Sequence, residues 1–330
     1  MTREAEGPAA PFLRHLSPGC SEQERNAKAV EARDILTAIQ AGRDIDLDGV
    51  AVIGDLFLDT LPLMSVDRLN GLSEGLLHDV RDHGIRTVRV IRGALTLTHA
   101  RVHGMIGTRL HEGLLVVQGP VNLTGTSFEQ TLDWSHTAFA GPVDLSDAVL
   151  LRGAFCLRCL FDQSARFDRT AFGTHSRFHQ SRFRNQASFE RAGFGGLAEF
   201  LEVTFEQETN LSRTYFKQGA GFSGSRFGGT VDFSEALFEK QAFFTFAIFQ
   251  RDAYFRSATF RAAADFSDAD FRQLDDFSNV LFGQPPVFIR TKITQIPKGA
   301  GGLEGSRILY SIAALLAILT LLLIFFLRKG

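Results

Sequence analysis

Hydrophobic residues recur through residues 121 to 290 at steps of alternately five and six positions. One series advances by 11 residues and holds Phe at every position except Leu150. A second series follows six residues after each member of the first, with Trp134, Leu145, Cys156 and Leu211 at its positions without Phe. Steps of five and six do not fit the 3.6-residue period of a helix, so the pattern predicts short extended segments separated by corners.

The two series contain 25 of the 32 Phe residues of the chain. The first series holds Phe128, Phe139, Phe161, Phe172, Phe183, Phe194, Phe205, Phe216, Phe227, Phe238, Phe249, Phe260, Phe271 and Phe282. The second holds Phe167, Phe178, Phe189, Phe200, Phe222, Phe233, Phe244, Phe255, Phe266, Phe277 and Phe288. We expect these side chains to form the structural core, because one residue type repeated at a fixed spacing is the signature of a repeat architecture.

The residue two positions before almost every Phe of the series is small, as at Ala165, Ser181 and Thr209. Large and small inward positions therefore alternate. Four corners complete one turn of about 22 residues, and successive turns would stack at roughly 4.8 Å, the separation of hydrogen-bonded strands. The pattern predicts an all-β solenoid with stacked Phe and Ala along its axis.

Residues 264–268 (ADFSD) and 269–273 (ADFRQ) closely match the unit of the pentapeptide-repeat family. That unit has a central Leu or Phe, a small residue two positions before it, and polar residues pointing outward. Over about residues 121 to 288 the sequence resembles this family, in a membrane-anchored bacterial variant. The resemblance implies a right-handed, four-sided β-solenoid. Every second step has six residues here, so we expect an extra residue at alternate corners and turns that differ from those of the family.

The residues before the regular repeat divide into three parts. Residues 1–20 are rich in Pro and Gly, lack a secretory hydrophobic run and are expected to be a flexible N-terminus without a signal peptide. In residues 21–42, Ser21 and Glu24 form a capping-box pattern, which predicts one helix over 22–41 that closes the first coil. Residues 43–120 alternate like strands and predict irregular coils, with a helical excursion at about 60–84.

The regular solenoid is expected to end near residue 290. Residues 291–307 are Gly-rich and read as a linker. Residues 308–327 then contain no charge, and twenty residues at about 1.5 Å each are long enough to cross roughly 30 Å of hydrocarbon. We predict a single transmembrane helix here, followed by a short tail at 328–330. A small excess of Lys and Arg before it places the solenoid on the cytoplasmic side.

The composition and net charge of the chain do not indicate a particular class of partner. The chain has 35 basic and 37 acidic residues, a formal net charge of −2, so no global field attracts nucleic acid or repels a membrane. Three cysteines argue against a disulfide framework and fit a reducing compartment. Cys156 and Cys159 form a C-x-x-C, but both occupy inward positions, and no further ligands are spaced for zinc. We therefore expect them to be core cysteines.

The surrounding residues argue against a binding role for the other candidate motifs. Gly219, Gly221 and Gly224 match a dinucleotide-binding pattern, but no helix is expected to follow them. His99 and His103 lie in a strand-like segment and are expected to be solvated. The aspartates at 265, 268, 270, 275 and 276 fall on different sides of a coil, so they would not converge on a cation. The sequence predicts no catalytic residues, no cofactor and no metal site, and hence no enzyme.

Arginines are concentrated between residues 152 and 191. Arg suits the recognition of carboxylates and phosphates, so this band is the candidate partner surface, the alternative being a solvated face that keeps a long rod soluble. Its residues are Arg166, Arg169, Arg177, Arg182, Arg184 and Arg191.

Three functions remain open from the sequence. The leading hypothesis is a non-enzymatic, membrane-tethered scaffold or protein-interaction module, with 308–327 in the membrane and an unidentified protein partner. The second is an auxiliary subunit of a membrane channel or transporter. The third, implied by the family resemblance, is a DNA mimic that modulates a topoisomerase, which the weak charge of the repeat disfavours. A further expectation is that the last coils pair with a second copy, as a homodimer, or lie against the membrane interface. Nucleic-acid binding is disfavoured.

Overall fold

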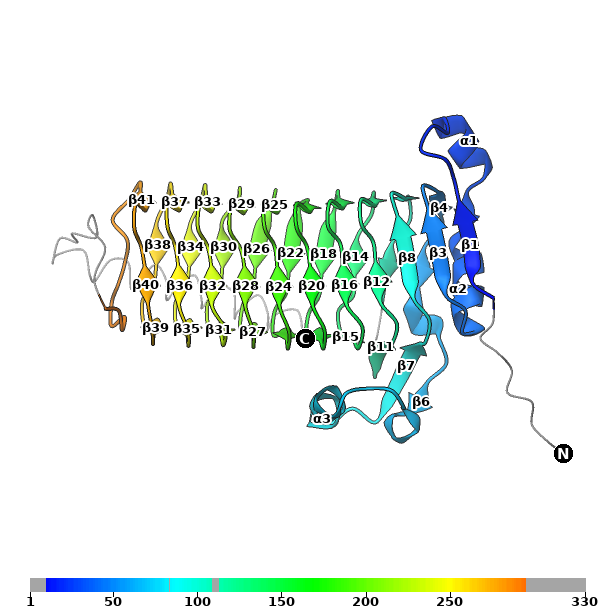
Figure 1. Cartoon of the computed structure of the whole chain (residues 1–330), viewed down its shortest axis with the longest axis horizontal. Coiled ribbons are helices and arrows are strands. Elements are labelled where there is room, and N and C mark those ends of the chain that lie inside the picture. Colours follow the sequence, from blue (N-terminus) through cyan, green and yellow to red (C-terminus); the bar gives the residue numbers. More distant parts are fainter. Residues whose placement is uncertain (1–9, 83, 109–112, 295–330) are drawn as a thin grey trace, which may run out of the picture.

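In the regular coils the chain turns a corner every five or six residues, which leaves room for strands of only two or three residues on each side. The computed structural model describes residues 10–82, 84–108 and 113–294. They wind into a right-handed, four-sided β-solenoid (Figure 1). Each side of the coil builds one sheet, and we name the four sheets A to D in the order in which the regular coil visits them.

Sheets A and B each contain eleven parallel strands. Sheet A contains β1 (Phe12–His15), β3 (Ile45–Asp48), β8 (Leu95–Thr98), β12 (Val121–Asn122), β16 (Val143–Asp144), β20 (Ala165–Arg166), β24 (Ala187–Ser188), β28 (Thr209–Asn210), β32 (Val231–Asp232), β36 (Ala253–Tyr254) and β40 (Asp275–Asp276). Sheet B contains β2 (Val30–Glu31), β4 (Ala51–Ile53), β9 (Arg101–Val102), β13 (Ser127–Phe128), β17 (Val149–Leu150), β21 (Ala171–Phe172), β25 (Gly193–Phe194), β29 (Tyr215–Phe216), β33 (Leu237–Phe238), β37 (Thr259–Phe260) and β41 (Leu281–Phe282).

Sheets C and D complete the coil. Sheet C contains β5 (Leu56–Phe57), β10 (Ile106–Gly107), β14 (Leu132–Asp133), β18 (Gly153–Phe155), β22 (His175–Arg177), β26 (Leu197–Glu199), β30 (Ala220–Gly221), β34 (Ala242–Phe243) and β38 (Ala264–Asp265). Sheet D contains β6 (Met64–Ser65), β7 (Thr87–Ile91), β11 (Leu114–Val117), β15 (Thr137–Phe139), β19 (Leu160–Phe161), β23 (Arg182–Phe183), β27 (Thr204–Phe205), β31 (Arg226–Phe227), β35 (Ile248–Phe249) and β39 (Asp270–Phe271). Only β6 is antiparallel to its neighbour among the strands of the described residues.

The register of the regular coils joins each residue to its equivalent one full turn later. Phe172 pairs with Phe194, for example, and Phe194 with Phe216. Each inward side chain therefore lies on its equivalent in the next coil. Phenyl rings stacked in this way have centroids 4.3 to 5.3 Å apart and planes within 13° of parallel. Rings of the same coil meet edge to face, as Phe222 and Phe233 do at 83°.

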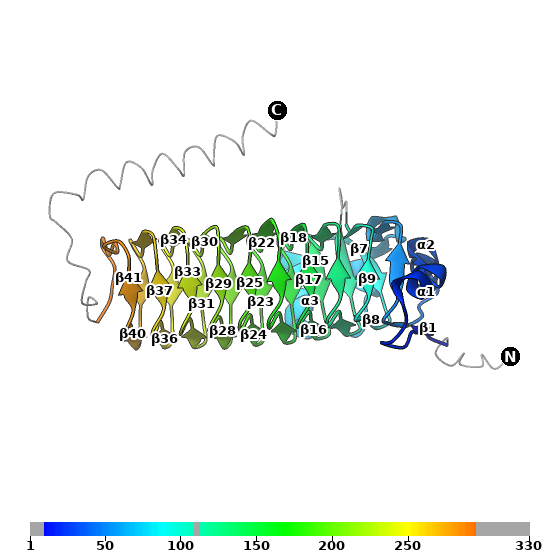
Figure 2. The ribbon, with the colours of Figure 1, turned by 90° about the horizontal axis from the view of Figure 1, so that it is seen from above.

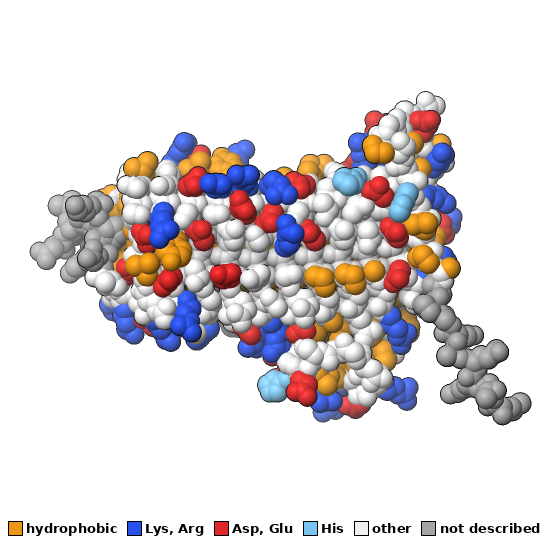
Figure 3. Space-filling model, in the orientation of Figure 1, with side chains coloured by type: hydrophobic (Ala, Val, Ile, Leu, Met, Phe, Trp, Pro, Cys, Tyr) orange, Lys and Arg blue, Asp and Glu red, His pale blue; other side chains and the backbone are white. Residues whose placement is uncertain are grey.

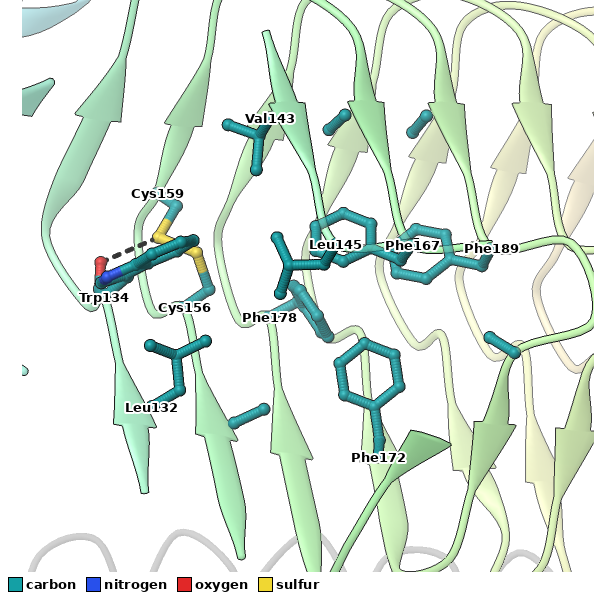
Figure 4. Close-up of a cluster of buried hydrophobic side chains, with 14 of the residues drawn as sticks. Leu132, Trp134, Val143, Leu145, Cys156, Cys159, Phe167, Phe172, Phe178 and Phe189 are labelled. Atoms are coloured by element: carbon teal, nitrogen blue, oxygen red, sulfur yellow. Dashed lines mark hydrogen bonds between the residues drawn. A yellow bond between two sulfur atoms is a disulfide. The ribbon is translucent and has the colours of Figure 1, made fainter. Parts of the chain in front are cut away.

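Figure 4 shows where the aromatic columns begin. Trp134, Leu145 and Cys156 occupy positions that Phe fills in later coils, and Phe167, Phe178 and Phe189 continue from there. All six side chains are buried. The sequence-based core prediction is confirmed for most of the series. Phe277, Phe282 and Phe288 are only partly buried, because they lie in the last coil that the described residues form.

Two kinds of corner alternate and account for the five- and six-residue steps. The five-residue corner is a hydrogen-bonded turn, as between the Ala148 amide and the Leu145 carbonyl, and its third residue has a positive φ. Asp147 (φ 59°) and Arg169 (φ 56°) occupy this place, which resembles a type II turn. The six-residue corner is an open bend that takes up the extra residue, as at Gly195 and Gly196.

The N-terminal region differs from the single helix expected over 22–41, and that prediction is wrong. The predicted capping box of Ser21 and Glu24 is present, but it starts a short helix, α1 (Glu22–Ala27). The chain then forms β2, whose Val30 pairs with Val52. A second helix, α2 (Ala32–Gln40), follows and packs Ile35, Ala38 and Ile39 into the core of the first coil.

The residues between β5 and β7 leave the regular path of the coil, and β6 within them extends sheet D at its edge. They contain two short 3₁₀ helices, η1 (Leu58–Thr60) and η2 (Val66–Arg68), and the helix α3 (Glu74–Asp82). Leu76 and Val80 of α3 pack with Val116 and Leu160 of sheet D in a second hydrophobic cluster. Figure 1 shows this excursion beside the early coils.

No helix within the described residues is long and apolar enough to span a membrane. The transmembrane helix predicted over 308–327 lies outside the described residues, as does most of the linker predicted over 291–307.

The aromatic columns give a prediction on stability. Phe205 is fully buried and stacks on Phe183 at 4.9 Å and on Phe227 at 5.2 Å. We expect Phe205→Ala to lower the free energy of unfolding by about 3–5 kcal/mol, because it leaves a cavity between two coils. Phe243→Ala removes an exposed ring and should stay within about 0.5 kcal/mol of the wild type. Denaturant titration measures both, and equal losses would contradict the proposed core.

Candidate protein-interaction surfaces

The register of one full turn also aligns the outward side chains, so each sheet carries a straight ladder of surface residues. The ladder on sheet A is polar, and Figure 3 shows acidic and basic side chains distributed over this face. From β12 to β40 it consists of Asn122, Asp144, Arg166, Ser188, Asn210, Asp232, Tyr254 and Asp276. A protein that binds this fold would therefore contact rows of side chains spaced at about the strand separation of 4.8 Å.

The six arginines of the predicted partner surface do not form one patch. Their span in the sequence exceeds one turn of the coil, so they are distributed over three of its sides and the corners between them. Arg166 lies on sheet A, Arg177 on sheet C and Arg182 on sheet D, while Arg169, Arg184 and Arg191 lie at corners or bends.

Each of the six is also within ion-pair distance of a carboxylate of this chain. Arg169 donates to Asp147 of the neighbouring coil through two nitrogens, at 2.7 and 2.8 Å. The remaining pairs are Arg166 with Asp144 and Asp168, Arg177 with Glu199, Arg182 with Asp79 and Glu206, Arg184 with Asp79 and Asp162, and Arg191 with Glu190. A partner would have to compete with these internal carboxylates.

Two of these arginines hold the excursion in place. Asp79 of α3 is 5% exposed, and its two oxygens accept hydrogen bonds from Arg182 at 3.1 Å and Arg184 at 3.2 Å. Gly75 makes this approach possible, because a Cβ there would overlap the Arg184 guanidinium. Ser73 adds a hydrogen bond to Asp162 at 2.8 Å. Sequence reasoning missed Asp79, because its partners lie far from it along the chain.

The two other exposed groups that stand out are Phe243 and Phe246, which are 39% and 58% exposed. Both lie outside the two inward Phe series. Phe243 points outward from β34, and Phe246 follows at the adjacent five-residue corner with φ 58°. A bulky residue in the left-handed region is uncommon and strained. The equivalent corner positions of the other regular coils are His136, Arg158, Gln180, Glu202, Gly224, Asp268 and Arg290.

Glycines lie beside this phenylalanine pair on one side and carboxylates frame it. Gly221 is the register partner of Phe243, and Gly224 donates a backbone hydrogen bond to Thr245, next to Phe246. Gly224 is exposed beside the two rings, whereas Gly221 is buried. The adjoining positions in the flanking coils are acidic and comprise Glu199, Glu202, Asp265 and Asp268.

Two of the four carboxylates, Glu202 and Asp265, have no ion pair among the described residues. Glu202 accepts from the Gln180 amide at 2.8 Å, and Asp265 accepts from the Ser267 backbone amide at 2.8 Å. The patch therefore combines an apolar centre with a partly uncompensated negative frame. The sequence contained a signal for it, because Phe243 and Phe246 are off-series residues inside an otherwise regular repeat.

Cys156 and Cys159 are buried, as the sequence predicts, but they are joined in a disulfide. The expectation of two separate core cysteines is wrong in this respect. Cys156 and Cys159 are three residues apart, and both point inward at the same corner. Their Cα atoms are 5.5 Å apart, which is within the usual range for a disulfide. Figure 4 shows the disulfide beside Trp134 in the interior.

The described residues contain no group of three or more His, Cys, Asp or Glu that could hold a metal ion. His99 pairs with Asp48 at 2.9 Å and His103 with Glu129 at 2.9 Å, so the two histidines have separate partners. A shallow polar groove of about 470 Å³ runs along the six-residue corners between sheets D and A, from Arg184 to Arg251. Its lining contains one carboxylate, Glu208.

The fold and its surfaces define a solenoid protein that displays fixed lines of side chains around a packed aromatic core. Residues 189–237 and 200–248 match the family model of pentapeptide repeats (9 copies). Repeats of the pentapeptide-repeat family are thus detected in residues 189–248 of the chain. Neither a curated protein nor a solved structure matches it.

The anchoring of the excursion can be tested through Asp79. We expect Asp79→Asn to weaken the hydrogen bonds to both arginines and to speed amide hydrogen exchange across residues 66–82 by at least about tenfold. Exchange in the coils from β24 onward should not change. Asp82→Asn is the matched control, since Asp82 is an exposed carboxylate of the same helix. Equal effects of the two variants would contradict the anchoring role.

Cross-coil ion pairs also predict how stability depends on pH. Burial opposes ionisation of Glu199, but His179 at 3.7 Å and the hydrogen bond from Arg177 at 2.7 Å outweigh it and lower its pKa. A lowered pKa in the folded state stabilises the protein above the unfolded-state value, and this contribution is lost as the pH falls through the folded-state value. We expect the melting temperature to fall below about pH 4, and to fall less steeply for Glu199→Gln. Parallel melting curves for the two proteins from pH 7 to 3 would contradict this.

Proposed function

We propose that this protein is a non-enzymatic scaffold, tethered to a membrane through residues 308–327, that binds a protein partner through Phe243 and Phe246. The observation that carries the proposal is Phe246, an exposed ring in a strained backbone conformation. The packed core gains nothing from this residue, and its equivalents in other coils are polar or Gly. Strain retained at a surface position is a reason to infer function.

The patch indicates the chemistry of the partner. Exposed aromatic side chains commonly supply most of the binding energy of a protein interface, provided that surrounding residues exclude water. Gly224 is exposed and has no side chain, so a partner can approach the backbone next to the rings there. The uncompensated carboxylates of Glu202 and Asp265 favour a basic rim on the partner. The partner surface is therefore an apolar pocket edged by Lys or Arg.

The membrane tether rests on the sequence of residues 308–327. Twenty residues without charge match the hydrocarbon thickness of a bilayer, and the preceding Gly-rich residues would let the solenoid move relative to the membrane. The excess of basic residues before the segment supports a solenoid on the cytoplasmic side. A rigid solenoid on such a tether would hold a partner close to the membrane surface.

Recovery of cross-linked partners from native membranes tests the interaction. The full chain carrying Phe243→Ser and Phe246→Asn is compared with the wild type and with Leu274→Ser, which changes an exposed apolar residue elsewhere. We expect partner recovery to fall at least about tenfold only in the Phe variant, because its contacts are central to the interface. Asn tolerates a positive φ, so this variant should be at least as stable as the wild type.

Two results would count against the proposal. Undiminished recovery with the Phe variant would exclude the patch as the interface, and a loss with Arg191→Glu instead would favour the arginines. Flotation with phospholipid vesicles tests the tether separately. Leu316→Arg with Leu321→Arg should release the chain from the vesicles, and flotation equal to that of the wild type would contradict membrane insertion of this segment.

A further inference from the structure

The outward ladder of sheet B differs from the ladder of sheet A in having no charge over eight coils. It consists of Ser127, Val149, Ala171, Gly193, Tyr215, Leu237, Thr259 and Leu281. Val149, Tyr215 and Leu281 are among the exposed large hydrophobic residues of the molecule. Figure 2 looks onto this sheet, and neither α1, α2 nor the excursion with α3 covers it beyond the first coils. We call it the uncharged face.

The size of the uncharged face limits what can cover it. Val149 and Leu281 are six coils apart, which is about 29 Å at 4.8 Å per coil. The strands are short, so the flat part is about 10 Å wide, and its area is on the order of 300 Å². Stable dimers bury about 800 Å² per partner. A second copy or a free protein would therefore bind here only weakly.

A segment of the same chain can bind to an area this small. A covalent tether gives an effective concentration of the order of millimolar, so a small contact area is sufficient. The chain has one uncharged segment of matching size, residues 308–327. As a helix it would be about 30 Å long and about 10 Å across, which are the length and width of the uncharged face.

We infer that the uncharged face is the docking site of residues 308–327 whenever this segment is outside a bilayer. The inference concerns the segment that the proposed function places in the membrane, but it does not depend on the partner surface. Docking would remove one side of an apolar helix from water. It would leave the surface around Phe243 and Phe246 free. Insertion into a bilayer would release the face.

The connection fixes the direction of the helix. Residues 295–307 separate the last described residue, Thr294, from Ile308, and thirteen residues can span about 43 Å. Leu281 and Thr294 both lie at the C-terminal end of the solenoid, so this length reaches from one side of the last coil to the other. In the docked arrangement that we infer, Ile308 would lie near Leu281, and the segment would run back so that Leu327 is near Val149.

Engineered disulfides in the full chain test both the contact and its direction. In a Cys20→Ser background made by cell-free translation without membranes, two pairs match the predicted register: Leu281→Cys with Leu309→Cys, and Val149→Cys with Phe326→Cys. The crossed pair, Val149→Cys with Leu309→Cys, and the sheet A pair, Asp144→Cys with Phe326→Cys, are controls. Mass spectrometry of non-reduced peptides after mild oxidation at low protein concentration identifies the bonds.

We expect both register pairs to form intramolecular disulfides at least about tenfold more than the two controls. Added phosphatidylcholine–phosphatidylglycerol vesicles should reduce this cross-linking. Equal yields in all four pairs, or no disulfide in any of them, would overturn the inference. Disulfides between two chains would also overturn it and would assign the face to a second copy. Because the controls share residues with the register pairs, a folding defect cannot mimic the expected pattern.

Discussion

The separation of hydrogen-bonded strands, about 4.8 Å, is the constraint on which the structure depends. It sets the rise of each coil, and flat phenyl rings stack comfortably at the same distance. Phe172 and Phe194, with centroids 4.5 Å apart, satisfy the backbone and the core at once. A narrower side chain in place of a Phe within an aromatic column leaves a gap. The interior therefore tolerates little change, whereas the outward positions are free to differ from sheet to sheet.

The solenoid could be predicted from the sequence because its packing is periodic along the chain. Each inward Phe recurs at a fixed interval, so a pattern of single positions reports the three-dimensional register. The helices at the N-terminus could not be predicted in the same way. Val30 joins sheet B by pairing with Val52, and this non-local bond interrupts a segment whose local pattern favours one helix. Pairing between distant residues outweighed local helix propensity.

The surface was harder to predict, for a related reason. Residues close in sequence separate onto different sides of a four-sided coil, and residues one turn apart come together. The arginines of the predicted band therefore point in different directions, and the carboxylates that neutralise them come from the neighbouring coil, as Asp147 does, or from the excursion, as Asp79 does. The phenylalanine patch was accessible to sequence reasoning, because any Phe outside the two series must be explained by something other than the core.

The alternation of the two corner types has a consequence for how such a chain can change its length. Inserting the sequence of one full turn would add one complete coil, extend every ladder by one rung and keep each face on its own side. Inserting the sequence of half a turn would also preserve the interior, since the series of inward positions repeats at that interval. It would, however, rotate all later coils by half a turn, so the later part of the uncharged face would continue on the side of sheet D. Genetic duplication of the shorter unit could thus redirect a binding surface without disturbing the core.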